Sequence, residues 1–394
     1  MNKSILHLAN PANEWENASP IGNGTSGMMV FGGVASDKLT LNEESIWSGG
    51  EVGTKVEGYA EKIRYIRQLF IDDREEEADA WTTENMSECF NRIKSYEYAG
   101  IINVRLHENG ECENYRRDLD LTNGILNISY TKDGGKYERE YFASYPASLI
   151  CARYSADKKF SASISFTREK VVSVTYRAGI LEANCKTMYG DNGFKVCVRI
   201  KTDGKQTADL TGITIEEAGY IELYTCIVTT FKHSDLVSAK EELLSHADKS
   251  YDEMKREHIA DFSAFMGRSS LELEDDAELS ELTATERLER LKNEPEAHDY
   301  SLMALYWQFG KYLLVSSSRN GTLPANLQGV WADGLTPPWS SDYHTNINLQ
   351  MNYWQAEEAN LGECTSALFD YMNNYLLPGG KKVACENYES RGMV

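Results

Sequence analysis

Residues 160–166 read Phe-Ser-Ala-Ser-Ile-Ser-Phe, and residues 194–200 read Phe-Lys-Val-Cys-Val-Arg-Ile. Apolar and polar residues alternate in both stretches, which is typical of a strand with one buried face. The alternation recurs up to about residue 235, with turn-forming clusters such as 132–135 between the segments. Because so many half-buried strands must cover one another's apolar faces, the pattern predicts an antiparallel β-sandwich over residues 1–235.

Helical spacing of apolar residues occurs in two parts of the chain. Within residues 58–80, Ile63, Ile66 and Phe70 recur at helical spacing among charges, so we expect a helix that decorates the sandwich. From residue 236 onward, long helical stripes of apolar residues replace the alternation. The predicted elements of this second part are a helical linker over residues 236–299, the start of a helical domain over residues 300–394, further helices at about 348–360 and 364–377, and a stop at residues 378–380.

The net charge limits the partners of the chain. With 61 Asp and Glu residues against 40 Lys and Arg residues, the formal net charge is −21. Nucleic acid and an anionic membrane both require a basic face, so we expect neither as a partner. A neutral substrate is compatible with this charge. The 23 Tyr and 7 Trp residues supply flat faces on which such a substrate can stack, although a sandwich core also uses them.

Eight cysteines are scattered along the chain, without CxxC pairs or zinc-ligand spacings to histidine. We therefore expect buried or free thiols, and no segment calls for a metal or an organic cofactor. The first residues lack an apolar run of signal-peptide length, and no run of 18 apolar residues follows, so the expected location is the cytoplasm. The cysteines are Cys89, Cys112, Cys151, Cys185, Cys197, Cys226, Cys364 and Cys385.

A glycine-rich stretch departs from the strand pattern at residues 20–27, which read Pro-Ile-Gly-Asn-Gly-Thr-Ser-Gly. Residues 41–49 then read Leu-Asn-Glu-Glu-Ser-Ile-Trp-Ser-Gly. Glycine permits positive φ and close backbone approach, so a sharp turn between strands explains the first stretch without any function. Alternatively, Glu43 and Trp47 belong to a loop that reaches a binding site in the neighbouring domain.

The second unusual stretch, residues 318–354, is a long loop rich in tryptophan and carboxamide residues between two predicted helices. Loops of this length usually build sites. Trp331, Trp339 and Trp354 offer stacking faces, while the carboxamides of Asn326 and Gln328 match hydroxyl groups because each carries donors and an acceptor. The alternative interpretation is that the carboxamides only satisfy buried loop backbone.

Several stretches, taken together and in order, resemble segments of the α-L-fucosidases of glycoside hydrolase family 95. They are PIGNG at residues 20–24, LNEESIWSG at 41–49, TATERL at 283–288, FGKYLLVSSSRNGTLPANLQGVW at 309–331 and TNINLQMNYW at 345–354. The resemblance implies an N-terminal β-sandwich, a helical linker and an (α/α)6 barrel, of which this chain is expected to hold only the start. It also implies inverting hydrolysis that releases terminal L-fucose from fucosylated glycans.

The resemblance implies that Asn346 and Asn348 hold the attacking water. An amide oxygen orients a water but is too weak a base to deprotonate it, so a carboxylate must assist. An inverting glycosidase also needs a carboxylic acid for the leaving oxygen. The resemblance implies that both carboxyl groups lie downstream of residue 394, so we expect this chain to be inactive alone.

The expected substrate-binding residues surround these two asparagines in the sequence. On an extended segment His344 would share a face with Asn346 and Asn348, so its imidazole is expected to bind a sugar hydroxyl, although it could instead order the loop. The full set is His344, Trp331, Trp339, Trp354, Gln328, Asn326, Glu43 and Trp47. Departures from the family pattern are Thr25 and Ser26 after the glycine-rich turn, Lys311, and Gln355.

Two other hypotheses remain. The chain could be a non-catalytic, carbohydrate-binding or subunit-interacting remnant of such an enzyme. A carboxyl group within the chain could also replace the missing acid, the candidates being Glu357, Glu358, Glu363 and Asp342. An incomplete barrel is further expected to expose an apolar flank, which a second chain would cover.

Overall fold

The computed structural model describes residues 4–50, 56–86, 94–107, 110–274, 278–294 and 296–394. The chain divides into two compact units. The larger unit comprises Met1–Gly49 and Ser95–Ala367, and the smaller unit comprises Gly50–Lys94 and Leu368–Val394. The domain boundaries expected from the sequence, at residues 235 and 299, stay predictions.

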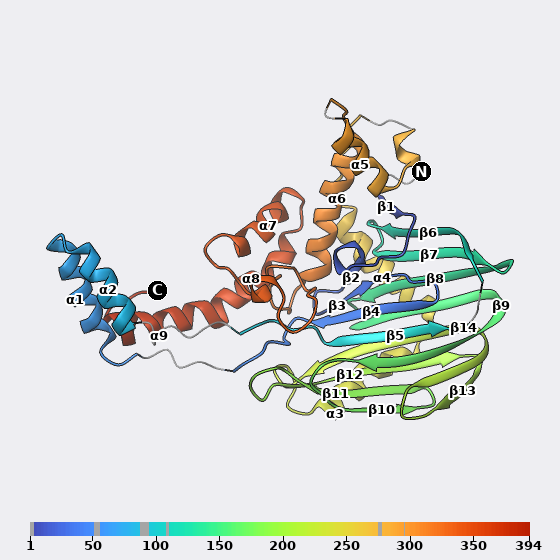
Figure 1. Ribbon diagram of the computed structural model, residues 1–394, viewed down its shortest axis with the longest axis horizontal. Helices are drawn as coiled ribbons and strands as arrows, with labels where there is room; N and C mark the ends of the chain where they lie inside the picture. Colours follow the sequence, from blue (N-terminus) through green and yellow to red (C-terminus); the bar gives the residue numbers. More distant parts are fainter. Residues whose placement is uncertain (1–3, 51–55, 87–93, 108–109, 275–277, 295) are drawn as a thin grey trace. The chain divides into compact units, whose positions relative to one another are not determined.

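The larger unit begins with a sheet of fourteen strands among the described residues, and every strand pair in it is antiparallel (Figure 1). The strands are β1 (Ile5–Leu8), β2 (Ser19–Gly22), β3 (Ser26–Val30), β4 (Ser36–Glu43), β5 (Gly100–Leu106), β6 (Cys112–Asp120), β7 (Ile125–Lys132), β8 (Gly135–Ser144), β9 (Leu149–Thr167), β10 (Val171–Arg177), β11 (Ile180–Lys186), β12 (Gly193–Thr202), β13 (Lys205–Ala208) and β14 (Ile213–Thr229).

Two long strands, β9 and β14, join the parts of this sheet (Figure 1). Residues 149–156 of β9 pair with β8 and residues 162–167 pair with β5, while β14 pairs along the opposite edge. β2 contacts β7 and β8, and β3 contacts β9, without pairing, so one part of the sheet packs on another. The predicted N-terminal antiparallel sheet followed by helices is confirmed.

Helices follow the sheet from residue 236 onward. Asp235 caps the first of them by accepting hydrogen bonds from the backbone nitrogens of Val237 and Ser238. The helices of the larger unit are α3 (Leu236–Ser245), α4 (Tyr251–Met266), α5 (Ala284–Asn293), α6 (Tyr300–Ser317) and α7 (Asn348–Glu358), and α8 (Ser366–Tyr371) spans the boundary between the units. The (α/α)6 barrel stays a prediction.

The apolar stripe of α3 and α4 packs on the sheet. Tyr251 and Met254 of α4 join Phe142 of β8 and Tyr224 of β14 in one buried cluster. The seven cysteines among the described residues are free thiols, while Cys89 lies outside those residues. α3 and α4 are therefore held against the sheet.

The smaller unit contains α1 (Tyr59–Ile71), α2 (Glu75–Met86) and α9 (Leu377–Tyr388). The single helix expected over residues 58–80 is two helices, because the chain turns at Asp73, whose φ is +54°. The stop expected at residues 378–380 is wrong. The helical backbone runs from α8 through a π-helical turn, Met372–Leu376, into α9 without a break, and Pro378 follows that wider turn.

Lys311 is a buried cation in the middle of α6, with no exposed surface. Its ammonium group donates to two backbone carbonyls, Met266 O at 3.0 Å and Ser269 O at 2.6 Å. Desolvation lowers the pKa of Lys311 from 10.5 to about 8. Lys311 thus ties the end of α4 to α6 while keeping its charge out of water.

The lowered pKa of Lys311 predicts a pH effect on stability. Between pH 8 and pH 10.5 the unfolded chain binds more protons than the folded chain, so the free energy of unfolding rises with pH in this window. From pH 7 to pH 9.5 the wild type should gain about 2 kcal/mol more than Lys311→Met. Urea unfolding at the two pH values measures this difference. The exposed Lys292→Met is the control, and identical pH profiles for wild type and Lys311→Met would contradict the assignment.

Candidate functional site

The glycine-rich hairpin of β2 and β3 packs against the loop that joins α6 and α7. A Cβ atom at Gly22 would lie 2.4 Å from Ser316 O, and one at Gly27 would lie 2.7 Å from Trp331 Nε1. Gly24 forms the turn with φ +90°. Asn23 Oδ1 accepts hydrogen bonds from Thr25 N and Ser26 N. The glycines are therefore needed for the turn and also for contact with the loop.

Trp331 anchors this loop in the protein. Its side chain is 4% exposed, and Nε1 donates to Ile21 O at 2.9 Å. The ring packs in a buried cluster with Ala12, Met29 and Phe31. Trp331, expected from the sequence to stack on a substrate, thus presents only part of its ring to any cavity.

The carboxamides near Trp331 hold the loop in shape. Asn326 Oδ1 accepts from Gln328 N at 2.9 Å and from Ser341 Oγ at 3.0 Å. Asn352 Nδ2 donates to the carbonyls of Ala325 at 3.1 Å and Asn326 at 2.8 Å. The structure therefore places Asn326 where it satisfies loop atoms, the alternative that the sequence left open, and its predicted contact with substrate stays a prediction.

Glu43, at the end of β4, is 1% exposed, and its carboxylate lies 3.0 Å from Lys232 Nζ. The neighbouring Glu44 also pairs with Lys232 and accepts from Leu323 N at 2.7 Å. Burial, opposed by Lys232, raises the pKa of Glu44 to about 8. These acids support the loop from inside the protein.

Trp47 supports the segment that precedes the two asparagines. Its ring lies between Tyr96 and Tyr343, with ring centroids 5.2 Å and 5.1 Å away, and Nε1 donates to Glu44 O at 2.8 Å. Tyr343 directly precedes His344, whose imidazole pairs with the carboxylate of Asp342. Trp47 therefore contacts this segment through the ring of Tyr343.

The segment of residues 344–348 is a turn, so the expectation that it is extended is wrong. Leu349 N donates to His344 O at 3.0 Å, which closes the turn, and α7 begins at Asn348. Asn346 is exposed at the turn, and Asn348 is half-buried. Alternation therefore does not place His344 on the face of the asparagines, because the backbone reverses between them.

Trp339 and Trp354 are both exposed, at 76% and 63% of their surface. Trp339 begins three consecutive residues in the left-handed region, with φ values of +48°, +56° and +48°. Such backbone costs free energy and is common at functional sites. Trp354 lies on α7. Both rings are free to meet a ligand from solvent, in contrast to Trp331.

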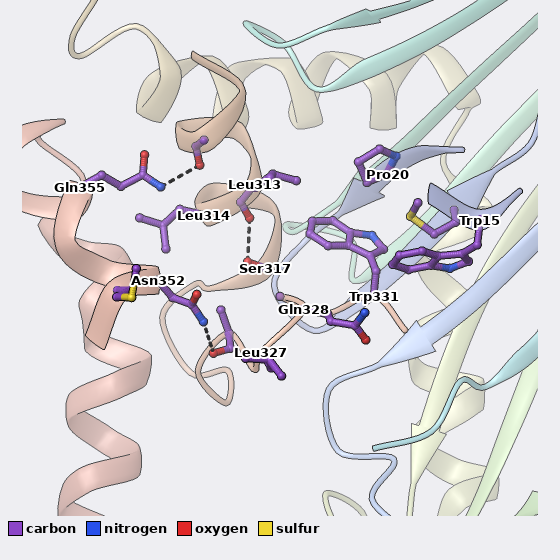
Figure 2. A pocket seen from close by; sticks show the side chains of 15 residues that line it. Trp15, Pro20, Leu313, Leu314, Ser317, Leu327, Gln328, Trp331, Asn352 and Gln355 are labelled. Atoms are coloured by element: carbon purple, nitrogen blue, oxygen red, sulfur yellow. Dashed lines mark hydrogen bonds between the residues drawn. The ribbon is translucent and has the colours of Figure 1, made fainter. Parts of the chain in front are cut away.

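A cavity of about 500 Å³ lies between α6, α7 and the strands β2 and β3 (Figure 2). Of the residues expected from the sequence, Gln328 and Trp331 line it. Asn352 and Gln355 line it from α7, and Asn348 stands four and seven residues before them, on the same helical face. The cavity thus lies along α7, and Asn348 is not among the residues that line it.

Sequence reasoning missed most of the residues that line this cavity, among them Asn352, Gln355 and Trp15. Asn352 stands within the quoted TNINLQMNYW, and its spacing of four from Asn348 is a signal that could have found it. Gln355 was noted only as a departure from the family pattern. Trp15 reaches the cavity from a turn before β2, and no spacing in the sequence indicates this contact.

Comparisons with known proteins match two parts of the chain. Residues 6–234 match the family described as "Glycosyl hydrolase family 65, N-terminal domain", and residues 250–394 match the "Glycosyl hydrolase family 95 catalytic domain". The chain belongs to glycoside hydrolase family 95. Its two motifs, the glycine-rich hairpin and the tryptophan-rich loop, fall one in each matched region.

Two curated relatives of this family 95 chain are named as fucosidases. It is 32% identical to "Alpha-L-fucosidase 2" of Arabidopsis thaliana, over 99% of this chain and 51% of the relative. It is 29% identical to "Probable alpha-fucosidase A" of Aspergillus oryzae, over 96% of this chain and 56% of the relative. The chain therefore spans about half the length of these relatives.

A solved structure named as a kojibiose phosphorylase from the human microbiome shares the fold, with a TM-score of 0.59 and 10% sequence identity. The likeness covers 100% of this chain and 51% of that chain. Within the described part of this family 95 chain, no helix is long and apolar enough to cross a membrane. The same residues hold no group of three or more His, Cys, Asp or Glu side chains placed to bind a metal.

Gly22→Ala is expected to lower the free energy of unfolding by about 1–3 kcal/mol. The added Cβ would lie 2.4 Å from Ser316 O, a backbone atom that moves only if α6 moves. The measurement is chemical unfolding. Gly379→Ala is the control, because a Cβ there meets nothing within 4 Å. Equal stability of the two variants would contradict the close contact between the hairpin and α6.

Proposed function

We propose that this chain supplies the water-positioning half of an inverting α-L-fucosidase site, and that Asn346 and Asn348 hold the attacking water. The observation that carries the proposal is the turn at residues 345–347, which presents Asn346 to solvent and Asn348 at the first position of α7. The names of the relatives support fucosylated glycans as the substrate class.

The chemistry proposed for this turn uses the two amides as acceptors. Each amide oxygen accepts a hydrogen bond from the water and so fixes the direction of its lone pair toward the anomeric carbon. Asn348 stands at the first position of α7, so the helix holds its amide in place. His344, oriented by Asp342, is proposed to bind a sugar hydroxyl.

We propose that the general acid and the assisting carboxylate come from outside this chain, because the four internal candidates are poorly suited to act as acid. Glu357 and Glu358 are exposed at the far end of α7 from Asn348. Arg268 lowers the pKa of Glu363, whereas a general acid needs a raised pKa. Asp342 is paired with His344.

We also propose that further polypeptide covers the apolar cleft between α5 and α6. This cleft of about 500 Å³ is lined by Leu288, Met303 and Tyr306, which are 59%, 52% and 78% exposed. Large exposed apolar surfaces mark binding surfaces. The covering polypeptide would be the part of a family 95 enzyme that this chain does not match, or a second chain. The location that we propose for this chain is the cytoplasm.

A fusion tests the proposed function. Residues 1–394 are joined to the part of the Arabidopsis relative that this chain does not match, and release of L-fucose from a fucosylated lactose is measured. We expect release by the fusion and none by the 394-residue chain alone. Release of L-fucose by the chain alone would overturn the proposal that the general acid and the assisting carboxylate come from outside this chain. A folded fusion that binds the substrate without releasing fucose would favour the non-catalytic, carbohydrate-binding alternative.

A further inference from the structure

Asparagine is followed by glycine at five places in the chain. In such a pair the backbone nitrogen of glycine can attack the side-chain amide carbon of asparagine, because glycine has no Cβ to block the approach. The attack needs an amide that is free to rotate and a glycine N–H without a hydrogen bond. Four pairs lie wholly among the described residues, at 23–24, 123–124, 192–193 and 320–321, whereas Asn109, which precedes Gly110, lies outside them.

Three of the four pairs are held by hydrogen bonds on both reacting groups. In the first pair, Asn23 Nδ2 donates to Ser144 O at 3.0 Å. The nitrogen of Gly24 donates to Ser316 O at 2.8 Å. The corresponding bonds of the next two pairs run from Asn123 Nδ2 to Asp120 Oδ2 at 3.0 Å, from Gly124 N to Asp120 O at 2.8 Å, from Asn192 Nδ2 to Trp47 O at 2.9 Å and from Gly193 N to Thr230 Oγ1 at 3.1 Å.

The fourth pair, Asn320 and Gly321, is not held in this way. Both residues are exposed, and a Cβ at Gly321 would meet nothing within 4 Å. Within the described part of the chain, neither the side-chain amide of Asn320 nor the nitrogen of Gly321 makes a hydrogen bond. The pair forms the centre of a turn that Thr322 N closes on Arg319 O at 3.2 Å, and Gly321 has φ +77°. The two reacting groups are therefore adjacent and uncovered.

We propose that the fold selects Asn320 as a site of spontaneous deamidation. The nitrogen of Gly321 forms a bond to Cγ of Asn320, the bond from Cγ to Nδ2 breaks, and the amide leaves as ammonia with the proton from Gly321 N. Water then opens the resulting succinimide at either of its carbonyls, which gives aspartate or isoaspartate at position 320. Water is the co-reactant, and no electrons are transferred. The inference does not depend on the proposed function.

Deamidation would change the start of the tryptophan-rich loop. Tyr145 OH donates to Asn320 O at 2.9 Å. Asn320 also lines a cavity of about 150 Å³ together with Asp261 and Glu363. A new carboxylate would add negative charge beside these two acids, and like charges repel. Isoaspartate would also lengthen the main chain at the residue that holds Tyr145. Conversion therefore alters both charge and backbone next to Arg319, the buried partner of Asp261.

The test follows the four pairs by peptide mapping while the folded 394-residue chain is kept in mildly alkaline buffer. Mass spectrometry of the peptides separates asparagine from aspartate and isoaspartate. A held pair must first break its hydrogen bonds, so we expect conversion at Asn320 to be about 100-fold faster than in the three held pairs. Asn320→Gln keeps a carboxamide but closes its ring far more slowly. Conversion at this position should therefore cease in the variant, while the held pairs should convert as in the wild type.

The same chain unfolded in urea is the control for the fold. Without native hydrogen bonds, the four pairs should convert at rates within about 10-fold of one another. Conversion at Asn320 no faster than in the held pairs of the folded chain would overturn the proposal. An equal preference for Asn320 in urea would also overturn it, because the preference would then come from neighbouring residues in sequence and not from the fold.

Discussion

Trp331→Ala is expected to lose about 3–5 kcal/mol of the free energy of unfolding. The indole is almost fully buried, donates to Ile21 O and packs on Met29 and Phe31. The backbone of Gly27 also approaches the indole so closely that no Cβ fits between them. Truncation therefore leaves a cavity that the surrounding sheet cannot fill. Urea unfolding of the wild type and the variant measures the loss.

Trp354→Ala is the matched control for this stability change. Its ring is 63% exposed on α7, so the free energy of unfolding should change by no more than about 0.5 kcal/mol. If the two tryptophan variants lost the same stability, Trp331 would not be the anchor between the hairpin and the loop.

Asn348→Ala is expected to lower kcat of the fusion by about 10²–10⁴-fold and to leave KM nearly unchanged. The amide is proposed to orient the water, an interaction that matters in the transition state more than in substrate binding. Asn346→Ala should lower kcat by a similar factor and also leave KM nearly unchanged. The double variant should be little worse than either single variant, because the two amides act on one water.

Steady-state kinetics on a fucosylated lactose measure these effects. Asn373→Ala removes an exposed carboxamide outside the site and should leave both constants unchanged. A variant that raises KM and keeps kcat would show that the asparagines bind substrate rather than position water.

The sheet and the start of the helices after it could be predicted because their signals are local. Alternation of apolar residues every second position gave β9 and β12, and the change of period at residue 236 coincides with the start of α3. The capping residue Asp235 reinforces that start. Each of these features depends on neighbours in sequence, so a single chain reveals it.

The partners of the motifs could not be predicted, because they are far apart in sequence. Nothing near Gly22 indicates Ser316 as its neighbour, and nothing near Trp331 indicates Ile21 as its acceptor. A buried anchor and an exposed stacking platform use the same residue type, so Trp331 and Trp339 were indistinguishable. Their different roles depend on packing alone.

Two predictions of local backbone conformation, one at the site and one at Pro378, are wrong. The segment before α7 was expected to be extended, but the hydrogen bond from Leu349 N to His344 O folds it into a turn. Pro378 was expected to stop a helix, but the helical backbone continues past it after the π-helical turn of Met372–Leu376. In both cases one residue pattern allows two backbone paths, and tertiary packing selects between them.

We propose that Asn346 and Asn348 position the water of an inverting hydrolysis. ¹H NMR of the first fucose released by the fusion from a fucosylated lactose tests this role. We expect β-L-fucose to appear first and its signal to fall by at least about 10²-fold in the Asn346→Ala, Asn348→Ala variant. Initial release of α-L-fucose, or unchanged release by the double variant, would contradict it.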